Sequence, residues 1–285
     1  MASLKRVQIW DQQIAYREEG TGDTVLLIHG ITTNSFIWRN IIPLLSTTYR
    51  VLAIDLLGCG ESDKPLDVDY SIKNQAKMLE EFVDLLKLKP FHLVGHDIGG
   101  GVCQIFAVNN SKKIVDLTLI NSVAYDFWPV QPIIAMRTPI IRQLAMATLN
   151  FGLLKMVVKG GLFHKYKLTP ELMDLFWVQM KTEEGRKAFL WLAKCLDNSN
   201  LLEIEEKLRN IPLPVLIIRG EEDIYLGGKI AEKLHNEIPG SKLVLIPSAG
   251  HFIQEDEPEM MVKAIREFLQ KKSSLLKEEA LGFET

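Results

Sequence analysis

The sequence predicts an α/β protein in which a mostly parallel central sheet is flanked by helices. Continuous apolar runs rich in β-branched residues, such as 24–28 and 50–54, are expected for strands that are buried on both faces of a parallel sheet. Amphipathic stretches with helical spacing follow them, most clearly at 71–86. Because these two patterns alternate along the chain, we expect parallel strands with helices on both sides.

The first predicted element is a hairpin at the edge of the sheet, where residues 5–18 alternate between apolar and polar and residues 19–23 supply a turn. Further strands are predicted at 24–28, 50–54, 91–94, 114–120, 214–218 and 242–246, and further helices at 99–108, 229–238 and 260–269. These segments predict one α/β core domain that is built from residues 1–122 and 210–271.

Between residues 123 and 209 the alternation stops, and helical periodicity continues without strand runs. We interpret this segment as a helical cap inserted after the sixth strand. A cap in this place is expected to lie over the carboxyl ends of the strands, where open α/β sheets carry their sites. The alternative is a set of extra helices that bury their aromatic residues in a core of their own. The polar residues 272–285 are expected to form a disordered tail.

The composition is that of an ordinary globular protein and limits the kinds of partner. Of the 285 residues, 47% are hydrophobic and 24% are charged, and the formal net charge is -3. This balance predicts no broad basic surface, so nucleic acid is not an expected partner. The first residues lack the apolar core of a secretory signal, and no apolar run reaches the roughly 18 residues of a membrane span. We therefore expect a cytoplasmic protein without a membrane span.

The three cysteines, Cys59, Cys103 and Cys195, are widely spaced and form no CxxC pair. This pattern supports neither a disulfide framework nor a zinc site. The glycines also lack the spacing of a phosphate-binding loop or a dinucleotide-binding motif. We therefore expect reduced thiols, no metal ion and no cofactor.

The segment 91–101 gives the strongest indication of a catalytic residue. A predicted strand runs into the sequence GHDIG at 95–99 and then into a helix. The pattern G-x-Nu-x-G places its central residue on a sharp, strained turn, and the flanking glycines remove Cβ atoms that would clash there. Asp97 occupies the nucleophile position. Its side chain is aimed at the N-terminus of the following helix, where backbone N–H groups favour negative charge.

Four motifs, in this order, resemble those of the α/β-hydrolase superfamily. His29-Gly30 resembles the HG pair of the oxyanion loop, and residues 55–65 (DLLGCGESDKP) resemble the loop D-x-x-G-x-G-x-S-D-K-P. The elbow at 95–99 and the segment 250–255 (GHFIQE) complete the set. The resemblance covers nearly the whole chain outside the insertion. It implies the α/β-hydrolase fold and a catalytic triad in the chain order nucleophile, acid, histidine.

In this sequence the residues that fit this order are Asp97 as nucleophile, Asp223 as acid and His251 as base. Asp223 follows the predicted strand at which the superfamily usually has its acid, and His251 follows the last predicted strand. Asp126, after the strand that precedes the insertion, is an alternative acid.

The remaining acids and histidines near these motifs are expected to be structural or exposed. Glu221 and Glu222 are interpreted as solvated loop charges beside the acid position. The histidines that are not expected to act as the base are His29, His92, His96, His164 and His235.

With an aspartate in its elbow, the chain resembles the haloalkane dehalogenases and the epoxide hydrolases. These are the two large branches of the superfamily that use an aspartate as nucleophile. A carboxylate can displace a leaving group from a saturated carbon, giving an alkyl ester of Asp97 that water, activated by His251, then hydrolyses. Backbone N–H groups of Ile31 and Ile98 are expected to form the oxyanion hole. Asp223 is expected to orient the imidazole.

The two branches differ in how they stabilise the leaving group, and the sequence departs from both. Dehalogenases usually have Trp after the nucleophile and Asn after the HG pair, or use a Trp of the cap, whereas this chain has Ile98 and Ile31. Epoxide hydrolases usually have Pro two residues after HG, where this chain has Thr32, and use tyrosines of the cap as proton donors. The candidate donors are Tyr125, Trp128, Tyr166, Trp177, Trp191 and Tyr225.

Apolar residues around the elbow and in the insertion predict a pocket for a small to medium apolar organic substrate. The candidate lining residues are Trp38, Tyr125, Trp128, Tyr166, Trp177 and Phe252. The leading prediction is a hydrolase that opens a carbon–halogen bond or an epoxide through an aspartyl ester. Two alternatives stay open, an ester or lactone hydrolase in which His251 activates water directly and a non-catalytic protein of this fold that binds a small molecule. The sequence does not predict the oligomeric state.

Overall fold

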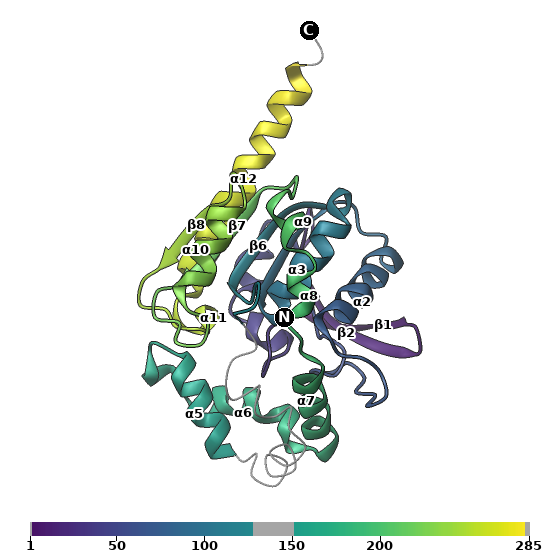
Figure 1. Ribbon diagram of the computed structural model, residues 1–285, viewed down its shortest axis with the longest axis vertical. Coiled ribbons are helices and arrows are strands. Elements are labelled where there is room, and N and C mark those ends of the chain that lie inside the picture. The colour runs from purple at the N-terminus through teal and green to yellow at the C-terminus, as the bar shows by residue number, and fades with distance from the viewer. Residues whose placement is uncertain (1, 128–150, 283–285) are drawn as a thin grey trace.

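One mostly parallel sheet forms the centre of the molecule (Figure 1). The computed structural model describes residues 2–127 and 151–282, of which 271–282 are described by their backbone alone. The eight strands lie in the order β1-β2-β4-β3-β5-β6-β7-β8. The pairs β1–β2 and β2–β4 are antiparallel, and the other pairs are parallel. The strands are β1 (Ser3–Ile9), β2 (Gln12–Glu19), β3 (Thr24–Ile28), β4 (Arg50–Ile54), β5 (Phe91–Asp97), β6 (Ile114–Ser122), β7 (Val215–Gly220) and β8 (Lys242–Ile246).

Helices cover both faces of the sheet, which explains why its strands are apolar on both sides. In β3, Leu26 and Ile28 pack into the apolar cluster of one face, and Val25 and Leu27 pack into that of the other. The first face carries α2 (Ile72–Leu85), α3 (Ile98–Asn109) and α10 (Gly228–Glu237), and the second carries α1 (Ile42–Leu45) and α12 (Pro258–Gly282).

The predicted α/β architecture is confirmed. Each predicted strand pairs in the sheet, and the N-terminal hairpin forms one edge through β1 and β2. The main difference lies at the elbow, where the strand predicted at 91–94 continues to Asp97 and the following helix begins at Ile98. Strand and helix therefore meet without a loop between them.

The helices between β6 and β7 divide into two groups. The first group lies beyond the carboxyl ends of the strands (Figure 1). We call it the inserted helices, and it consists of α5 (Phe151–Gly161), η4 (Lys165–Lys167), α6 (Pro170–Trp177), η5 (Val178–Lys181) and α7 (Glu183–Cys195). The second group, α8 (Ser199–Leu202) and α9 (Glu205–Arg209), lies against α3, and its Leu201, Ile204 and Leu208 belong to the apolar cluster of the core. The predicted insertion 123–209 thus includes a final part that packs on the core.

The C-terminal helix α12 is longer than the sequence analysis predicts. Its backbone continues to Gly282, where a disordered tail is expected from residue 272, and Figure 1 shows this end extending away from the body of the protein. The reason is local, since Leu, Lys, Glu and Ala, which dominate this segment, favour helix even where a chain is polar. Within the described part of the chain, no helix has the length and apolar character needed to cross a membrane.

Candidate active site

The turn between β5 and α3 holds Asp97 in an unusual backbone conformation. Its φ is 53° and its ψ is -122°, a combination that residues with a Cβ rarely adopt and that costs on the order of 1–3 kcal/mol. Glycines make room for the turn. A Cβ on Gly30 would lie 2.5 Å from Cβ of Asp97, and one on Gly99 would lie 2.3 Å from the carbonyl oxygen of His29. The predicted elbow is therefore present, and it places Asp97 at the carboxyl edge of the sheet.

The carboxylate of Asp97 lies between backbone N–H groups and an imidazole. Its Oδ1 accepts a hydrogen bond from the N–H of Ile31 at 2.8 Å. Its Oδ2 lies 3.8 Å from Nε2 of His251, which is too far for a hydrogen bond. Burial raises the pKa of Asp97 above its ordinary value, although His251 and the N–H groups of Ile31 and Ile98 act to lower it. Both residues predicted for the oxyanion hole thus act on this carboxylate.

His251 and Asp223 form a buried pair in the loops after β8 and β7. Nδ1 of His251 donates to Oδ2 of Asp223 at 3.0 Å, and Oδ1 of Asp223 accepts from the N–H groups of Tyr225 and Leu226 at 2.8 and 3.1 Å. Burial lowers the pKa of His251, but the charge and hydrogen bond of Asp223, together with the charge of Asp97, raise it above its ordinary value. For Asp223, burial acts to raise the pKa, and the charge and hydrogen bond of His251 outweigh it, so that this pKa is lowered. The structure therefore brings the three predicted triad residues together.

Two buried residues that the sequence analysis does not assign to the site hold the loop of His251. Asn121, at the end of β6, donates from Nδ2 to the carbonyls of Gly250 and His251 at 3.0 and 2.9 Å and accepts from the N–H of Gly220 at 3.0 Å. His96 donates from Nε2 to the carbonyl of His251 at 3.0 Å. Burial, followed by the nearby charge of His251, lowers the pKa of His96 to about 3, so its ring stays neutral. The one sequence signal for Asn121 is a polar residue that directly follows a predicted strand.

The helix α5 is hydrogen-bonded to the two loops that carry Asp223 and His251. The ring of Tyr225 packs edge-on against that of His251, with 5.4 Å between their centroids, and its hydroxyl donates to the carbonyl of Val157 in α5 at 2.6 Å. The N–H of Phe252 donates to the carbonyl of Gly161 at 3.2 Å. The inserted helices therefore contact residues next to both Asp223 and His251.

Asp256 makes a second connection between the inserted helices and the loop of His251. Its side chain is buried, and it accepts hydrogen bonds from the N–H groups of Gly250 and Phe163, both at 2.8 Å, and of His164 at 2.9 Å. Hydrogen bonds to an ionised acceptor are shorter and stronger than neutral ones. Asp256 therefore holds the residue before His251 against the turn that follows α5.

Aromatic rings from three segments stand beside the triad. Phe176 of α6 contacts both Phe36 and Phe252, each with 5.0 Å between ring centroids. Phe252 also contacts the ring of His251 at 5.0 Å. Next to these rings, a narrow space between the oxyanion loop and the inserted helices is lined mainly by apolar side chains, among them Phe176, Met180, Phe189 and Leu192. Apolar rings therefore border the triad, and Phe252, one of the predicted lining residues, is in contact with the ring of His251.

The tyrosines considered as proton donors do not turn their hydroxyl groups toward Asp97. Tyr125 faces α10, where its hydroxyl is directed toward Glu237. The backbone turns at Tyr125, whose φ is 56°, and the side chain is buried in the apolar cluster that also contains residues of α10. Tyr166 is 77% exposed, and the hydroxyl of Tyr225 is bound to a carbonyl of α5. None of these three hydroxyls is placed to donate a proton at Asp97, and the lining of the pocket by Tyr125 and Tyr166 stays a prediction.

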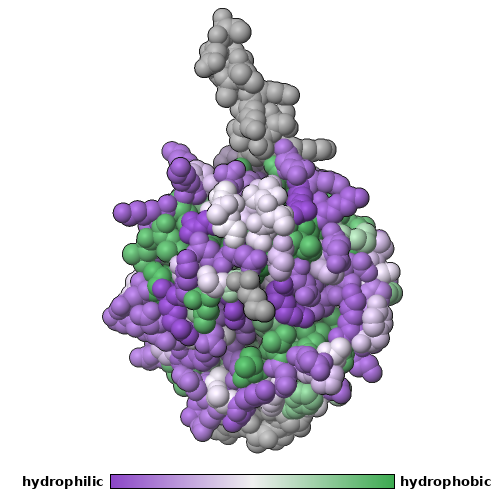
Figure 2. All heavy atoms as spheres, turned by 180° about the vertical axis from the view of Figure 1, so that it is seen from behind, coloured by the Kyte–Doolittle hydropathy of each residue, from purple (hydrophilic) through white to green (hydrophobic). Residues whose placement is uncertain are grey.

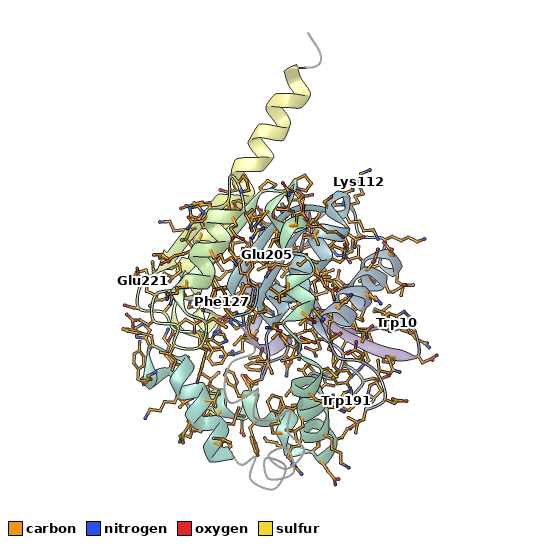
Figure 3. All side chains as sticks on the ribbon, in the orientation of Figure 1. Trp10, Lys112, Phe127, Trp191, Glu205 and Glu221 are labelled. Carbon is orange, nitrogen blue, oxygen red and sulfur yellow. The ribbon has the colours of Figure 1, made fainter. Side chains whose placement is uncertain are left out.

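The tryptophans are placed in different surroundings. Trp38 is fully buried and packs edge-on against the histidine of the elbow. Trp177, at the end of α6, packs against an aromatic ring of α5. Trp191 of α7 donates its Nε1–H to the carbonyl of Val68 at 2.7 Å, so this donor is occupied (Figure 3). Trp128 lies outside the described residues.

The other candidate acids do not reach the imidazole. Asp126, Glu221 and Glu222 are exposed, in agreement with the interpretation of the two glutamates as loop charges (Figure 3). His29 is structural, since its Nδ1 donates to the carbonyl of Gly30 at 2.8 Å and its Nε2 accepts from a backbone N–H at 3.0 Å.

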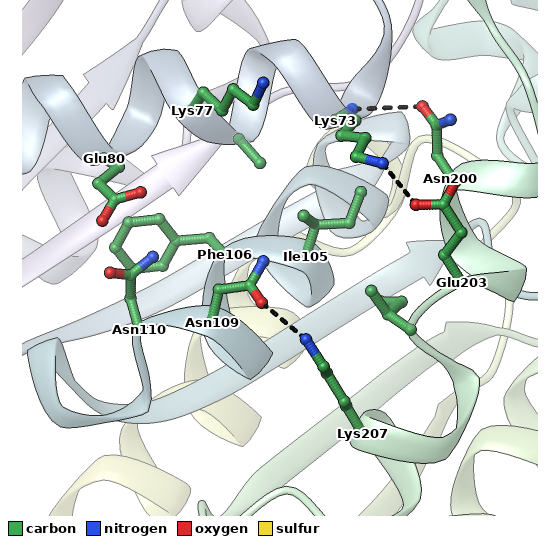
Figure 4. A pocket seen from close by; sticks show the side chains of 12 residues that line it. Lys73, Lys77, Glu80, Ile105, Phe106, Asn109, Asn110, Asn200, Glu203 and Lys207 are labelled. Carbon is green, nitrogen blue, oxygen red and sulfur yellow. Dashed lines mark hydrogen bonds and ion pairs between the residues drawn. The ribbon is translucent and has the colours of Figure 1, made fainter.

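A separate groove of about 280 Å³ lies between α2, α3 and the α8–α9 segment (Figure 4). Two of its lysines are bound to groups of the same groove, with Lys73 Nζ 2.5 Å from a carboxylate oxygen of Glu203 and Lys207 Nζ 3.3 Å from Oδ1 of Asn109. None of the triad residues lines it. Over residues 2–127 and 151–270, no three His, Cys, Asp or Glu side chains are grouped to bind a metal ion. The groove is therefore a surface feature of the core, separate from the candidate site.

Replacement of Asp256 by Asn tests whether this carboxylate fastens the loop of His251. The Asn amide offers an N–H₂ group where three N–H donors converge, so at least one donor loses its acceptor. We expect the free energy of unfolding to fall by about 1–3 kcal/mol, measured by urea denaturation. The control is Asp174→Asn, since Asp174 is exposed and makes only a surface ion pair with Lys181 at 3.2 Å. Equal effects of the two changes would contradict the role of Asp256.

Comparison with known proteins agrees with this geometry. The family described as alpha/beta hydrolase fold matches residues 23–258. Haloalkane dehalogenase 2 of Mycobacterium tuberculosis is 30% identical over 267 residues, which cover 90% of this chain and 91% of that protein.

Two solved structures are similar over nearly their whole length. The haloalkane dehalogenase DbeA from Bradyrhizobium elkani has a TM-score of 0.86 and 25% identity, with 96% of this chain and 100% of that chain covered. An alpha/beta hydrolase fold protein from Burkholderia ambifaria has a TM-score of 0.85 and 26% identity, with 93% and 99% covered. The chain therefore belongs to the α/β-hydrolase fold family, as a hydrolase with haloalkane dehalogenases among its relatives.

Proposed function

We propose that this protein hydrolyses the carbon–halogen bond of a small to medium apolar organic molecule through an ester on Asp97. The observation that supports the proposal most strongly is that the elbow carries the carboxylate of Asp97 instead of a hydroxyl group. This carboxylate faces the pair formed by His251 and Asp223. The similarity to haloalkane dehalogenases supports the same chemistry. The apolar rings beside the triad favour an apolar substrate.

In the first step, Oδ2 of Asp97 attacks the carbon that bears the halogen. A C–O bond forms as the C–halogen bond breaks, and the halide leaves with the bonding electron pair. Oδ2 is the attacking atom because Oδ1 is bound by the N–H of Ile31, whereas Oδ2 has no hydrogen bond from His251 at 3.8 Å. The product of this step is an alkyl ester of Asp97.

In the second step, His251 takes a proton from water, and the water oxygen attacks Cγ of the ester. The negative charge of the tetrahedral intermediate develops on Oδ1, where the N–H groups of Ile31 and Ile98 stabilise it. The intermediate collapses with release of the alcohol, which receives a proton from His251. Overall, alkyl halide and water give alcohol, halide and one proton.

The charges of the site favour this order of events. The Asp97 carboxylate is one of the groups that raise the pKa of His251. Formation of the neutral ester removes that charge, so the pKa of His251 falls when the base is needed. The first step thereby prepares His251 to accept a proton in the second.

The alternative of direct ester or lactone hydrolysis is less compatible with this geometry. A substrate carbonyl would need the N–H groups of the oxyanion hole, and Oδ1 of Asp97 already occupies the N–H of Ile31. A purely binding role does not require a histidine that is paired with an acid and directed at a carboxylate. Epoxide opening uses the same nucleophile, but the hydroxyl of Tyr125 is directed toward Glu237 and that of Tyr225 is bound to the carbonyl of Val157, so neither is directed at Asp97.

A His251→Gln variant tests the proposed ester. It keeps the nucleophile but lacks the base, so we expect the alkyl group to accumulate on Asp97 after incubation with mixed chloroalkanes and bromoalkanes. Intact-mass spectrometry with peptide mapping measures the adduct. The matched control is His235→Gln, since His235 lies on α10 and bonds Ser241 at 2.9 Å, and it is expected to turn over without accumulation. The same variant is also incubated with mixed epoxides, and an adduct that forms only with epoxides would replace the assignment of a halide substrate. The absence of any adduct, with haloalkanes and with epoxides, would contradict the proposed ester.

The pH dependence of ester hydrolysis tests the role of Asp223. The rate requires neutral His251, so it is expected to rise with pH and to level off above the pKa of this residue. Burial lowers that pKa, and the charge and hydrogen bond of Asp223 raise it. An Asp223→Asn variant is therefore expected to move the rising limb to lower pH and to reduce the plateau rate, as measured by single-turnover kinetics. If the rising part of the pH–rate profile stays at the same pH or moves to higher pH, the result would count against the pairing of Asp223 with His251.

A further inference from the structure

Asn121 is a buried polar residue with an unusual backbone conformation beside the candidate site. Polar side chains cover much of the surface that Figure 2 shows, whereas Asn121 is only 3% exposed. Where β5 pairs with β6, His96 lies opposite Ile120 and Asp97 lies opposite Ser122, so Asn121 is the extra residue of a bulge. Its φ is 37°, which Asn adopts more readily than most residues. A bulge next to an active site directs a side chain out of the regular alternation of its strand.

The side-chain amide of Asn121 joins the loop of the acid to the loop of the base. Its Nδ2 donates to the carbonyls of Gly250 and His251 at 3.0 and 2.9 Å, and its Oδ1 accepts from the N–H of Gly220 at 3.0 Å. A carbonyl only accepts and an N–H only donates, so the three partners fix the orientation of the amide. Gly220 ends β7 shortly before Asp223. One rigid group therefore sets the spacing of the two loops.

The backbone carbonyl of His251 is held by two donors. It accepts from Nδ2 of Asn121 at 2.9 Å and from Nε2 of His96 at 3.0 Å. A carbonyl oxygen has two lone pairs, so this acceptor is saturated. Asp256 also holds the loop, but it does so at the N–H of Gly250. Asn121 and His96 thus act on His251 itself and fix its backbone independently of its side chain.

The imidazole of His251 stays apart from Asp97 although the two groups attract each other. Its Nε2 lies 3.8 Å from Oδ2 of Asp97, and an approach of about 1 Å would form a hydrogen bond. The charge of each group shifts the pKa of the other toward its ionised form. Among the described residues, the acids that face the imidazole are Asp97 and Asp223, and the rings of His96 and Tyr225 contact it at 4.9 and 5.4 Å between centroids. The separation from Asp97 therefore depends on how the backbone of His251 is held.

We propose that Asn121 is a positioning residue that keeps the imidazole of His251 away from Oδ2 of Asp97. Because it binds the carbonyl of His251 to the bulge of β6, the imidazole binds Asp223 and leaves Oδ2 free of this donor. The inference rests on the proposed function for its consequence, since attack on a carbon atom requires a free Oδ2. The position of the imidazole itself does not depend on the bond that the enzyme breaks.

Titration of His251 by NMR in the unliganded protein tests this position without a substrate. Asn121→Ala removes all three hydrogen bonds, and Asn121→Gly removes them without the strain of a Cβ at a φ of 37°. We expect the pKa of His251 to rise in both variants, because an imidazole that moves closer to the carboxylate of Asp97 is stabilised in its charged form. The signal of His251 is identified by its loss in His251→Gln.

The matched control is Gln75→Ala. Gln75 is also a buried amide, and its side chain binds the carbonyl and the N–H of Leu57 at 2.9 and 3.1 Å. Its loss is expected to lower the free energy of unfolding, as the loss of Asn121 does, but to leave the pKa of His251 unchanged.

Single-turnover kinetics with a haloalkane measure the consequence for the nucleophile. The rate constant of ester formation on Asp97 is expected to fall about tenfold or more in both Asn121 variants, which is the effect of one hydrogen bond to a charged group. It should stay unchanged in Gln75→Ala.

Three results would overturn the proposal. The first is a pKa of His251 that stays the same or falls in the Asn121 variants, the second is ester formation at the rate of the unchanged protein, and the third is an equal effect of Gln75→Ala. If the unchanged protein forms no ester with any haloalkane, the proposed function fails, and the titration still decides whether Asn121 positions His251.

Discussion

At the end of β5, the chain turns within one residue, and the position of the Asp97 carboxylate depends on that turn. Asp97 adopts a φ of 53°, which directs its carboxylate to the N–H of Ile31 and to the start of α3. Such a turn is possible only where the neighbouring backbone can approach closely. A Cβ on Gly95 would lie 2.6 Å from the carbonyl oxygen of Gly99. The glycines therefore permit the strain, and the packed sheet and helix keep it in place.

The same arrangement accounts for the reactivity that we assign to Asp97. Burial removes water from the carboxylate, and this loss raises its pKa. Nε2 of His251 stays 3.8 Å from Oδ2, too far for a hydrogen bond between these two groups. A buried carboxylate with one oxygen bound by the N–H of Ile31 and the other not bound to the imidazole is suited to attack a carbon atom and then to carry an oxyanion on the bound oxygen.

The sequence predicts what depends on local pattern, and it fails where distant segments meet. The elbow and the acid and histidine positions are predictable because each follows a strand with a characteristic motif. The roles of Asn121, Asp256 and Tyr225 rest on contacts to other loops, and no spacing along the chain reveals them. Aromatic residues in the insertion are similarly ambiguous, since periodicity predicts a helix but not which neighbour its rings face. Tyr125, which turns to α10, illustrates this limit.

The central claim is that an oxygen atom of Asp97 becomes the oxygen of the alcohol product. A single turnover of a haloalkane in water enriched in oxygen-18, with enzyme in excess, tests this most directly by mass spectrometry of the product and of the Asp97 peptide. The account predicts an unlabelled alcohol and an Asp97 peptide that gains one oxygen-18, because water attacks Cγ of the ester. A labelled alcohol with an unlabelled Asp97 peptide would mean that water attacks the substrate directly, and it would contradict the account.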